Sequence, residues 1–233
     1  MLTLSALINY LKETPSSKIN YYLSMLFRIG GVKVKGSKNN TIHLRNTYAR
    51  KLKITIQGKG NVIDFNSVGG NFVKKTSIYI HGNNNRIVFG KRNYVECADL
   101  YMEDDGNLIS FGDHNRILGK THVACIEGTS ITFKDGCLFS DNVVFRTGDS
   151  HSILDAYTSK RINPSKSIKI GNRVWFGNTT KILKGITIGD DSIIGTGSVV
   201  TSDVAPNTIV AGVPARAVKS GVKWDLQRIK IEE

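Results

Sequence analysis

A spacing of six residues recurs through the last third of the chain. Aliphatic or aromatic residues stand at positions 170, 176, 182, 188, 194 and 200, and a small or β-branched residue stands four positions after each. This period matches neither an α-helix nor a continuous strand. It is typical of short β-strands joined by tight turns, each strand contributing one bulky and one smaller inward side chain. Three sixes make a coil of 18 residues, so the repeat predicts a parallel β-helix of stacked coils.

A similar motif recurs upstream with less regular spacing. It is found in ITIQGKGNVIDF (54–65), IYIHGNNNRIVF (78–89), LISFGDHNRILG (108–119) and ITFKDGCLFSDNVVF (131–145). We interpret the uneven gaps as loops inserted between coils. The asparagines and glycines are expected in the turns, where left-handed backbone angles are tolerated. The sequence therefore predicts an all-β fold, a parallel β-helix over residues 30–218, rather than a β-sandwich.

The two ends of the chain read differently from the repeat. Residues 3–28 place apolar side chains at helical spacing, with a break at Pro15, and predict a short helical cap over residues 1–29. A helix on a membrane surface stays open for this segment. We expect no signal peptide and no membrane span, because apolar runs of the required length and flanks are missing. The charged tail, 219–233, is expected to pack as a short helix or strand over the last coil.

The positive charge is concentrated in one region. The chain has a net charge of +13. Residues 28–92 hold fourteen Lys or Arg and a single acid, Asp64, so this segment alone accounts for +13 and the remainder balances. Such a region attracts polyanions, which include nucleic acids, anionic membranes and acidic polysaccharides, although a basic surface can also serve solubility. The cysteines Cys97, Cys125 and Cys137 are odd in number and predict free thiols in a reducing cytoplasm.

Four stretches resemble the hexapeptide-repeat acyltransferases, whose fold is the left-handed parallel β-helix. They are IKIGNRVWFG (168–177), ITIGDDSIIGTGSVVTSDV (186–204), IVAGVPARAVK (209–219), with Val213 where many members have Asn, and DSHSI (149–153). The resemblance covers about residues 105–219 well and 40–104 loosely. The DSHSI stretch resembles members that acetylate sugars and bacterial surface polysaccharides.

The resemblance implies transfer of acetyl from acetyl-CoA to a hydroxyl, at a site between neighbouring subunits of a homotrimer. It implies that His151 is the general base, and an ordinary histidine suits this role because it is mostly neutral near pH 7. Asp149 or Asp155 could orient the ring, and the residues do not choose between them. Trp175 falls where the family places a tryptophan beside the thiol end of CoA. The extended loop at about 148–167 resembles the protruding loop near the acceptor.

Further binding residues follow from the same resemblance. Asn178, Thr196 and Thr201 would face the pantetheine arm, and Arg216 and Lys219 could meet the CoA phosphates. Arg146, Lys160 and Arg161, beside or within the extended loop, are candidates for an acidic acceptor. We expect no metal site, because the nearest histidine pair, His114 and His122, is eight residues apart.

These observations favour a bacterial cytoplasmic O-acetyltransferase for a capsular or lipopolysaccharide sugar, acidic in character. Its only membrane contact would be peripheral, near the inner face. One alternative is an acetyltransferase for a small acceptor, such as a nucleotide-sugar amine or an antibiotic. Another is a non-catalytic β-helical binding protein. Nucleic-acid binding is disfavoured, because the basic segment holds Tyr48 and Phe72 but no recognised motif.

Overall fold

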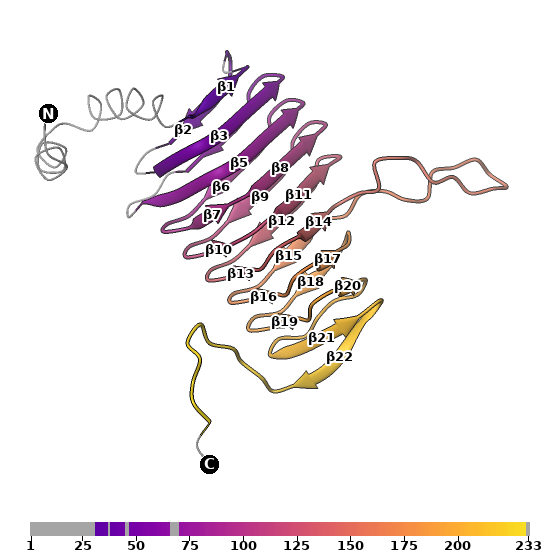
Figure 1. The fold of residues 1–233 in the computed structure, drawn as a ribbon. Coiled ribbons are helices and arrows are strands. Elements are labelled where there is room, and N and C mark those ends of the chain that lie inside the picture. Colours follow the sequence, from indigo (N-terminus) through magenta and orange to yellow (C-terminus); the bar gives the residue numbers. More distant parts are fainter. Residues whose placement is uncertain (1–30, 37, 45–46, 66–69, 232–233) are drawn as a thin grey trace, which may run out of the picture.

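The computed structural model describes residues 31–36, 38–44, 47–65 and 70–231 (Figure 1). All regular structure in these ranges is β-strand, and the strands stack as successive coils along one axis. The expected all-β, parallel β-helix is therefore confirmed. The helical cap expected over residues 1–29 lies outside the described residues. No helix in the described ranges is long and apolar enough to cross a membrane.

Strand pairing divides the coils into three faces. The first face contains the first half of β3 (Thr47–Gln57) and of β5 (Asn71–His81), then β7 (Tyr94–Glu96), β10 (Arg116–Ile117), β13 (Leu138–Phe139), β16 (Trp175–Phe176), β19 (Ile193–Ile194) and β21 (Thr208–Gly212). The second face contains β1 (Lys33–Lys35), the second halves of β3 and β5, β8 (Ala98–Glu103), β11 (Thr121–Ile126), β14 (Val143–Arg146), β17 (Lys181–Ile182) and β20 (Val199–Val200). The third face contains β2 (Thr41–His43), β4 (Val62–Asp64), β6 (Arg86–Phe89), β9 (Leu108–Phe111), β12 (Ser130–Phe133), β15 (Ile168–Ile170) and β18 (Thr187–Ile188). A final strand, β22 (Ala215–Ser220), pairs antiparallel with β21.

The coil length varies along the axis. Beyond β15 the register advances by 18 residues, from Trp175 to Ile193 on the first face, as the repeat predicted, and by 16 between β19 and β21. Upstream it advances by 24 between β3 and β5, and then by 22 from Tyr94 to Arg116 and from there to Leu138. The loops expected between the upstream coils are therefore not found in the two 22-residue coils. Their extra residues lengthen strands such as β8 and β11 and the turns beside them.

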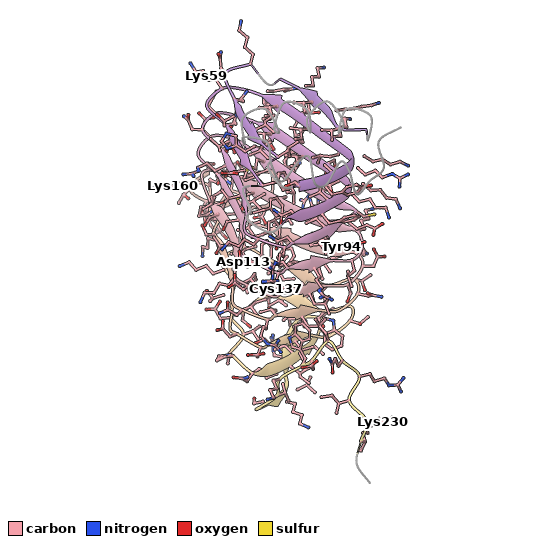
Figure 2. All side chains as sticks on the ribbon, turned by 90° about the vertical axis from the view of Figure 1, so that its left-hand side faces the viewer. Lys59, Tyr94, Asp113, Cys137, Lys160 and Lys230 are labelled. Carbon is pink, nitrogen blue, oxygen red and sulfur yellow. The ribbon has the colours of Figure 1, made fainter. Side chains whose placement is uncertain are left out.

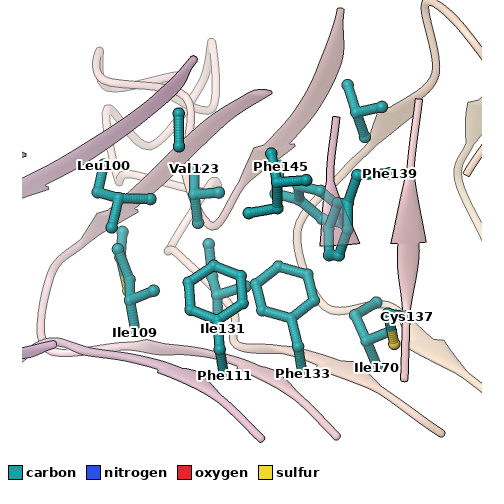
Figure 3. Packing of buried hydrophobic residues seen from close by; sticks show 14 of the residues in the cluster. Leu100, Ile109, Phe111, Val123, Ile131, Phe133, Cys137, Phe139, Phe145 and Ile170 are labelled. Atoms are coloured by element: carbon teal, nitrogen blue, oxygen red, sulfur yellow. The ribbon is translucent and has the colours of Figure 1, made fainter. Parts of the chain in front are cut away.

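Buried phenylalanines form the centre of the prism. Phe65, Phe89, Phe111 and Phe133 occupy the same inward position in successive coils, and their rings stack with centroids 4.4 to 4.6 Å apart. Parallel strands in exact register place like side chains over one another, and this geometry produces the stack. Figure 3 shows Phe111 and Phe133 at the C-terminal end of this stack. There Phe145 meets Phe133 edge to face at 4.9 Å.

Two ladders of buried asparagines hold the turns. Asn61, Asn85 and Asn107 are almost fully buried, and each Oδ1 accepts the backbone N–H of the corresponding residue in the next coil. Asn71, Asn93 and Asn115 form the second ladder. The expectation that asparagines and glycines take left-handed angles in the turns is confirmed for residues such as Asn84, Gly60 and Gly106. The ladder asparagines do not take these angles. Their buried amides instead satisfy turn N–H groups that water cannot reach.

The tail after β22 contains no strand or helix over residues 221–231. It is held by Trp224, which is buried against the first face. The Trp224 Nε1 donates to the Arg173 carbonyl, and the Arg173 guanidinium lies 5.2 Å from the Trp224 ring centroid. The expected short helix or strand beyond the last coil is thus replaced by one anchored aromatic side chain. The three cysteines carry free thiols.

Candidate functional site

One large excursion interrupts the coils. It lies between β14 and β15. On the third face, Ile131 of β12 pairs with Ile168 of β15, so the register advances by 37 residues at this coil. The chain leaves at the corner between the second and third faces and projects away from the prism before returning (Figure 1). Near the tip of this loop, Asp155 accepts hydrogen bonds from the backbone N–H groups of Tyr157 and Thr158. These contacts lower the pKa of Asp155, and the hydrogen bond from Thr158 has the largest effect. Asp155 is therefore committed to a local turn.

Asn163 joins the two arms of this loop where they leave the prism. Its side chain is only 6% exposed although most of the loop is exposed. The Asn163 Nδ2 donates to Asp149 Oδ2 at 2.9 Å and to the His151 carbonyl at 2.8 Å, and its Oδ1 accepts the Ile153 N–H at 2.8 Å. One buried amide therefore fixes the backbone on both sides of His151.

Two ion pairs fasten the loop to the neighbouring coils. Lys184 pairs with Asp149, and together with Asn163 it lowers the pKa of that carboxyl. Arg161 pairs with Glu127 in the turn after β11, and the pKa of Glu127 is lowered first by Arg161 and then by Ser165. Both pairs hold ionised carboxylates at neutral pH, so the base of the loop is a charged clamp.

His151 is exposed at the start of the loop. Within the described part of the chain, its imidazole makes no hydrogen bond or ion pair, and only its backbone carbonyl is engaged. The expectation that Asp149 or Asp155 orients the ring within one chain is corrected, because Lys184 and Asn163 engage Asp149 while the loop tip engages Asp155. The ring is free to face a ligand or a second subunit.

Trp175 lies on a different face from the loop. It belongs to β16 on the first face, whereas the loop leaves from the end of β14 on the second. The Trp175 side chain is 37% exposed, and its Nε1 donates to Ser140 Oγ at 3.4 Å. Its ring centroid is 6.1 Å from that of Trp224, the anchor of the tail. One chain therefore does not bring His151 and Trp175 together.

The expected CoA-binding residues occupy two corners and the end of the prism. Asn178 and Thr196 are stacked in successive coils at the corner between the first and second faces, where the Gly197 N–H donates to the Asn178 carbonyl. Thr201 follows β20 at the next corner. Arg216 lines a cavity of about 240 Å³ beneath β22, while Lys219 lies exposed on that strand. Within one chain these residues do not form a single pocket.

The expected acceptor residues also separate. Arg146 is exposed at the end of β14, and Lys160 points outward on the loop (Figure 2). Arg161 is instead a strut, because its guanidinium contacts both Glu127 and Asn163. Arg161 therefore has a structural role in the loop, and its expected role toward an acceptor stays a prediction.

Sequence reasoning missed Asn163, Lys184 and Glu127. None lies at a repeat position that distinguishes it, and each is far in sequence from its partner. Asn163 is 14 residues from Asp149, Lys184 is 35 from Asp149, and Glu127 is 34 from Arg161. Only the fold brings them to the base of the loop. No group of three or more His, Cys, Asp or Glu side chains in the described ranges is arranged to hold a metal ion.

The role of Asn163 can be measured directly. We expect Asn163→Ala to speed amide hydrogen exchange across residues 148–163 by about 10- to 100-fold, because it removes buried hydrogen bonds worth about 1–3 kcal/mol. Exchange in the coils should stay unchanged. Tyr157→Ala is the matched control, since this tip residue is 96% exposed. Equal exchange in Asn163→Ala and the wild type would show that the loop is held by other contacts.

Residues 167–202 match the bacterial transferase hexapeptide (six repeats) family. The chain carries hexapeptide repeats. This confirms the resemblance identified from the sequence, and the match covers the 18-residue coils that follow the loop.

Several known proteins resemble this hexapeptide-repeat chain. The galactoside O-acetyltransferase of Escherichia coli K12 is 36% identical over 98 residues, which cover 42% of this chain and 48% of that protein. The polysialic acid O-acetyltransferase of Escherichia coli O1:K1 / APEC is 33% identical over 95 residues, covering 41% of this chain and 31% of that protein. The chain thus spans less than half the length of these two relatives.

Solved structures extend the likeness over most of the fold. The polysialic-acid-specific acetyltransferase NeuO superposes with a TM-score of 0.75 at 26% identity, covering 87% of this chain and 85% of that one. The polysialic acid O-acetyltransferase OatWY superposes with a TM-score of 0.70 at 24% identity, covering 85% of this chain and 92% of that one. At that identity, the second likeness shows the fold alone.

Proposed function

We propose that this chain is an acetyl-CoA-dependent O-acetyltransferase that modifies a hydroxyl of an acidic bacterial surface polysaccharide. The observation that carries the proposal is the likeness to NeuO over 87% of the chain. The basic segment at 28–92 supports an acidic acceptor. We place the reaction in the bacterial cytoplasm, where acetyl-CoA is made.

His151 is the proposed general base. The acceptor hydroxyl attacks the thioester carbonyl while a ring nitrogen of His151 removes its proton, forming a tetrahedral oxyanion. Collapse of that oxyanion expels the CoA thiolate, which takes the proton from His151 and leaves as the thiol, with the acetyl ester on the sugar. The exposure of the ring and its lack of internal partners support this role, since a base must face its substrate.

The active site is proposed to form between subunits of a homotrimer. His151 and Trp175 lie on different faces of one chain, so a site that uses both needs a second copy. The loop of one subunit would carry His151 toward Trp175 on the first face of the next. The clamp of Asn163 and Lys184 holds the backbone of His151 in place for that approach, which limits the entropy lost when the site assembles.

Release of free CoA thiol tests the proposed reaction. The protein is mixed with acetyl-CoA and, separately, with polysialic acid, a uronic acid polymer, a neutral glucan and a small galactoside. We expect thiol release to accelerate with an acidic polymer and ester acetyl to appear on the sugar. If none of these acceptors accelerates release, the proposed reaction is wrong. Acceleration by the galactoside or the glucan alone would contradict the acidic acceptor.

A further inference from the structure

We propose that the second face is the binding surface for an extended acidic polysaccharide, with a cationic foothold formed by Lys33, Lys35 and Lys53 far from the reacting hydroxyl. This inference rests on the proposed function and assigns the acceptor polymer a place on the fold. The three lysines, which we call the foothold, lie on β1 and β3 at the N-terminal end of the second face (Figure 1).

The register stacks like charges at the foothold. Lys33 on β1 is the direct strand partner of Lys53 on β3, and all three foothold side chains are exposed. Like charges opposite one another destabilise a sheet. In the part of the chain that the structure describes, no carboxylate pairs with any of the three lysines. A bound polyanion would relieve this repulsion.

The adjoining corner adds to the same positive surface. Arg50 and Lys74 are direct strand partners, and Lys51 and Lys75 take left-handed backbone angles at the same corner of successive coils. Glu96 forms ion pairs with Lys74 and Lys75 and accepts a hydrogen bond from the Tyr94 hydroxyl. The charge here therefore stays strongly positive beside the foothold.

A column of side chains leads from the foothold toward His151. Lys35 lies in register with Thr55, and the column continues through Tyr79 and Tyr101 to Ala124 and Arg146. Ala124 is buried, so the exposed surface of the column is interrupted for one step before Arg146. Tyr79 and Tyr101 stack at 5.5 Å and give the column an amphipathic middle. His151 follows Arg146 by five residues, so the column ends where the loop begins.

The acids on this face are already engaged. Asp99 accepts hydrogen bonds from Ser77 Oγ at 2.6 Å and contacts His122 Nδ1 at 2.8 Å, and its pKa is lowered first by His122. Glu103 accepts the Tyr101 hydroxyl at 2.9 Å. Both carboxylates are thus held by partners within the face, whereas the foothold cations and Arg146 make no ion pair with a described carboxylate.

The length of the column specifies an extended ligand. Five steps separate β1 from β14, and at about 4.8 Å per step they span about 24 Å. A monosaccharide at His151 cannot reach the foothold, but an extended chain of acidic sugars can contact both. Recognition at the foothold should therefore depend on chain length.

The test uses two triple variants with equal loss of charge. The face variant is Lys33→Gln/Lys35→Gln/Lys53→Gln. The control variant is Lys91→Gln/Lys134→Gln/Lys169→Gln, which removes exposed lysines from the third face and its corner with the first. Binding of long polysialic acid is titrated without acetyl-CoA, and KM is measured for long polymer, for a sialic acid dimer and for acetyl-CoA.

For the face variant we expect about tenfold weaker binding of long polymer and a matching rise in its KM at low salt. The kcat, the KM for acetyl-CoA and the KM for the dimer should not change, and the control variant should bind like the wild type. An equal loss in both variants, or no loss in the face variant, overturns the inference. A wild type that binds long polymer through the foothold without acetylating it would leave the inference standing and refute the proposed function.

Discussion

His151→Ala lowers the rate of acetyl transfer by at least about a hundredfold, because a positioned general base contributes roughly 10²–10⁴ to the rate. The variant should lower kcat, since the ring accepts a proton in the transition state and does not bind acetyl-CoA. The His151 side chain makes no hydrogen bond or ion pair with a described residue, so its removal should not unfold the loop, which is held through the His151 carbonyl. The measurement is thiol release at saturating acetyl-CoA and acceptor.

His114→Ala serves as the control for this prediction. Like His151, His114 is exposed, but it lies at a corner away from the loop. His114 takes a left-handed backbone angle beside a turn. It should keep wild-type turnover. Both variants should bind CoA with unchanged affinity in a direct titration. Full activity of His151→Ala would exclude His151 as the base, and another group near Trp175 would then have to accept the proton.

Phe145→Ala lowers the free energy of unfolding by about 3–5 kcal/mol, which is the usual cost of deleting a buried aromatic ring. Phe145 is fully buried and meets Phe133, Phe139 and Phe176 at 4.9 to 5.8 Å. It lies where the wider coils meet the narrower ones, so the cavity would open at the level of the loop (Figure 3). Denaturant unfolding at one protein concentration measures the change.

Val144→Ala is the matched control, because Val144 lies on the same strand but points outward. It should cost less than about 1 kcal/mol, as is usual for a surface substitution away from a special contact. A loss in Phe145→Ala no larger than in Val144→Ala would mean that the core relaxes to fill the cavity. The cluster around Phe145 would then not be the packing centre that its contacts indicate.

Local periodicity in the sequence predicts some coil lengths, and others depend on pairing between distant strands. The 18-residue coil could be predicted, because identical inward positions recur at a fixed interval and the pairing of Trp175 with Ile193 follows that interval. The 22-residue coils upstream could not be distinguished from coils with inserted loops. Additional residues in strands and turns leave the same apolar motifs at wider intervals. Only the pairing of Tyr94 with Arg116 and of Arg116 with Leu138 shows that these two coils have the same length.

Some features of the candidate site could be predicted from the sequence, and others could not. His151 and Trp175 could be selected because both fall inside recognisable stretches, and the repeat itself places Trp175 on a strand. Their separation onto different faces could not be predicted, since it depends on which corner the loop leaves from. The buried amide of Asn163 and its contact with Asp149 were also invisible, because a hydrogen bond across the base of a loop leaves no period in the sequence.

The six-residue period is sufficient to predict the parallel β-helix, because it has few other physical solutions once each coil must bury its apolar side chains against the next. The order of residues also locates the excess positive charge in one segment of the chain. Where that charge lies relative to His151 depends on the three-dimensional fold. Register between strands far apart in sequence stacks Lys33 on Lys53 and leads the same face down to Arg146, and such pairings are set by the coil lengths of the whole fold and by no local residue pattern.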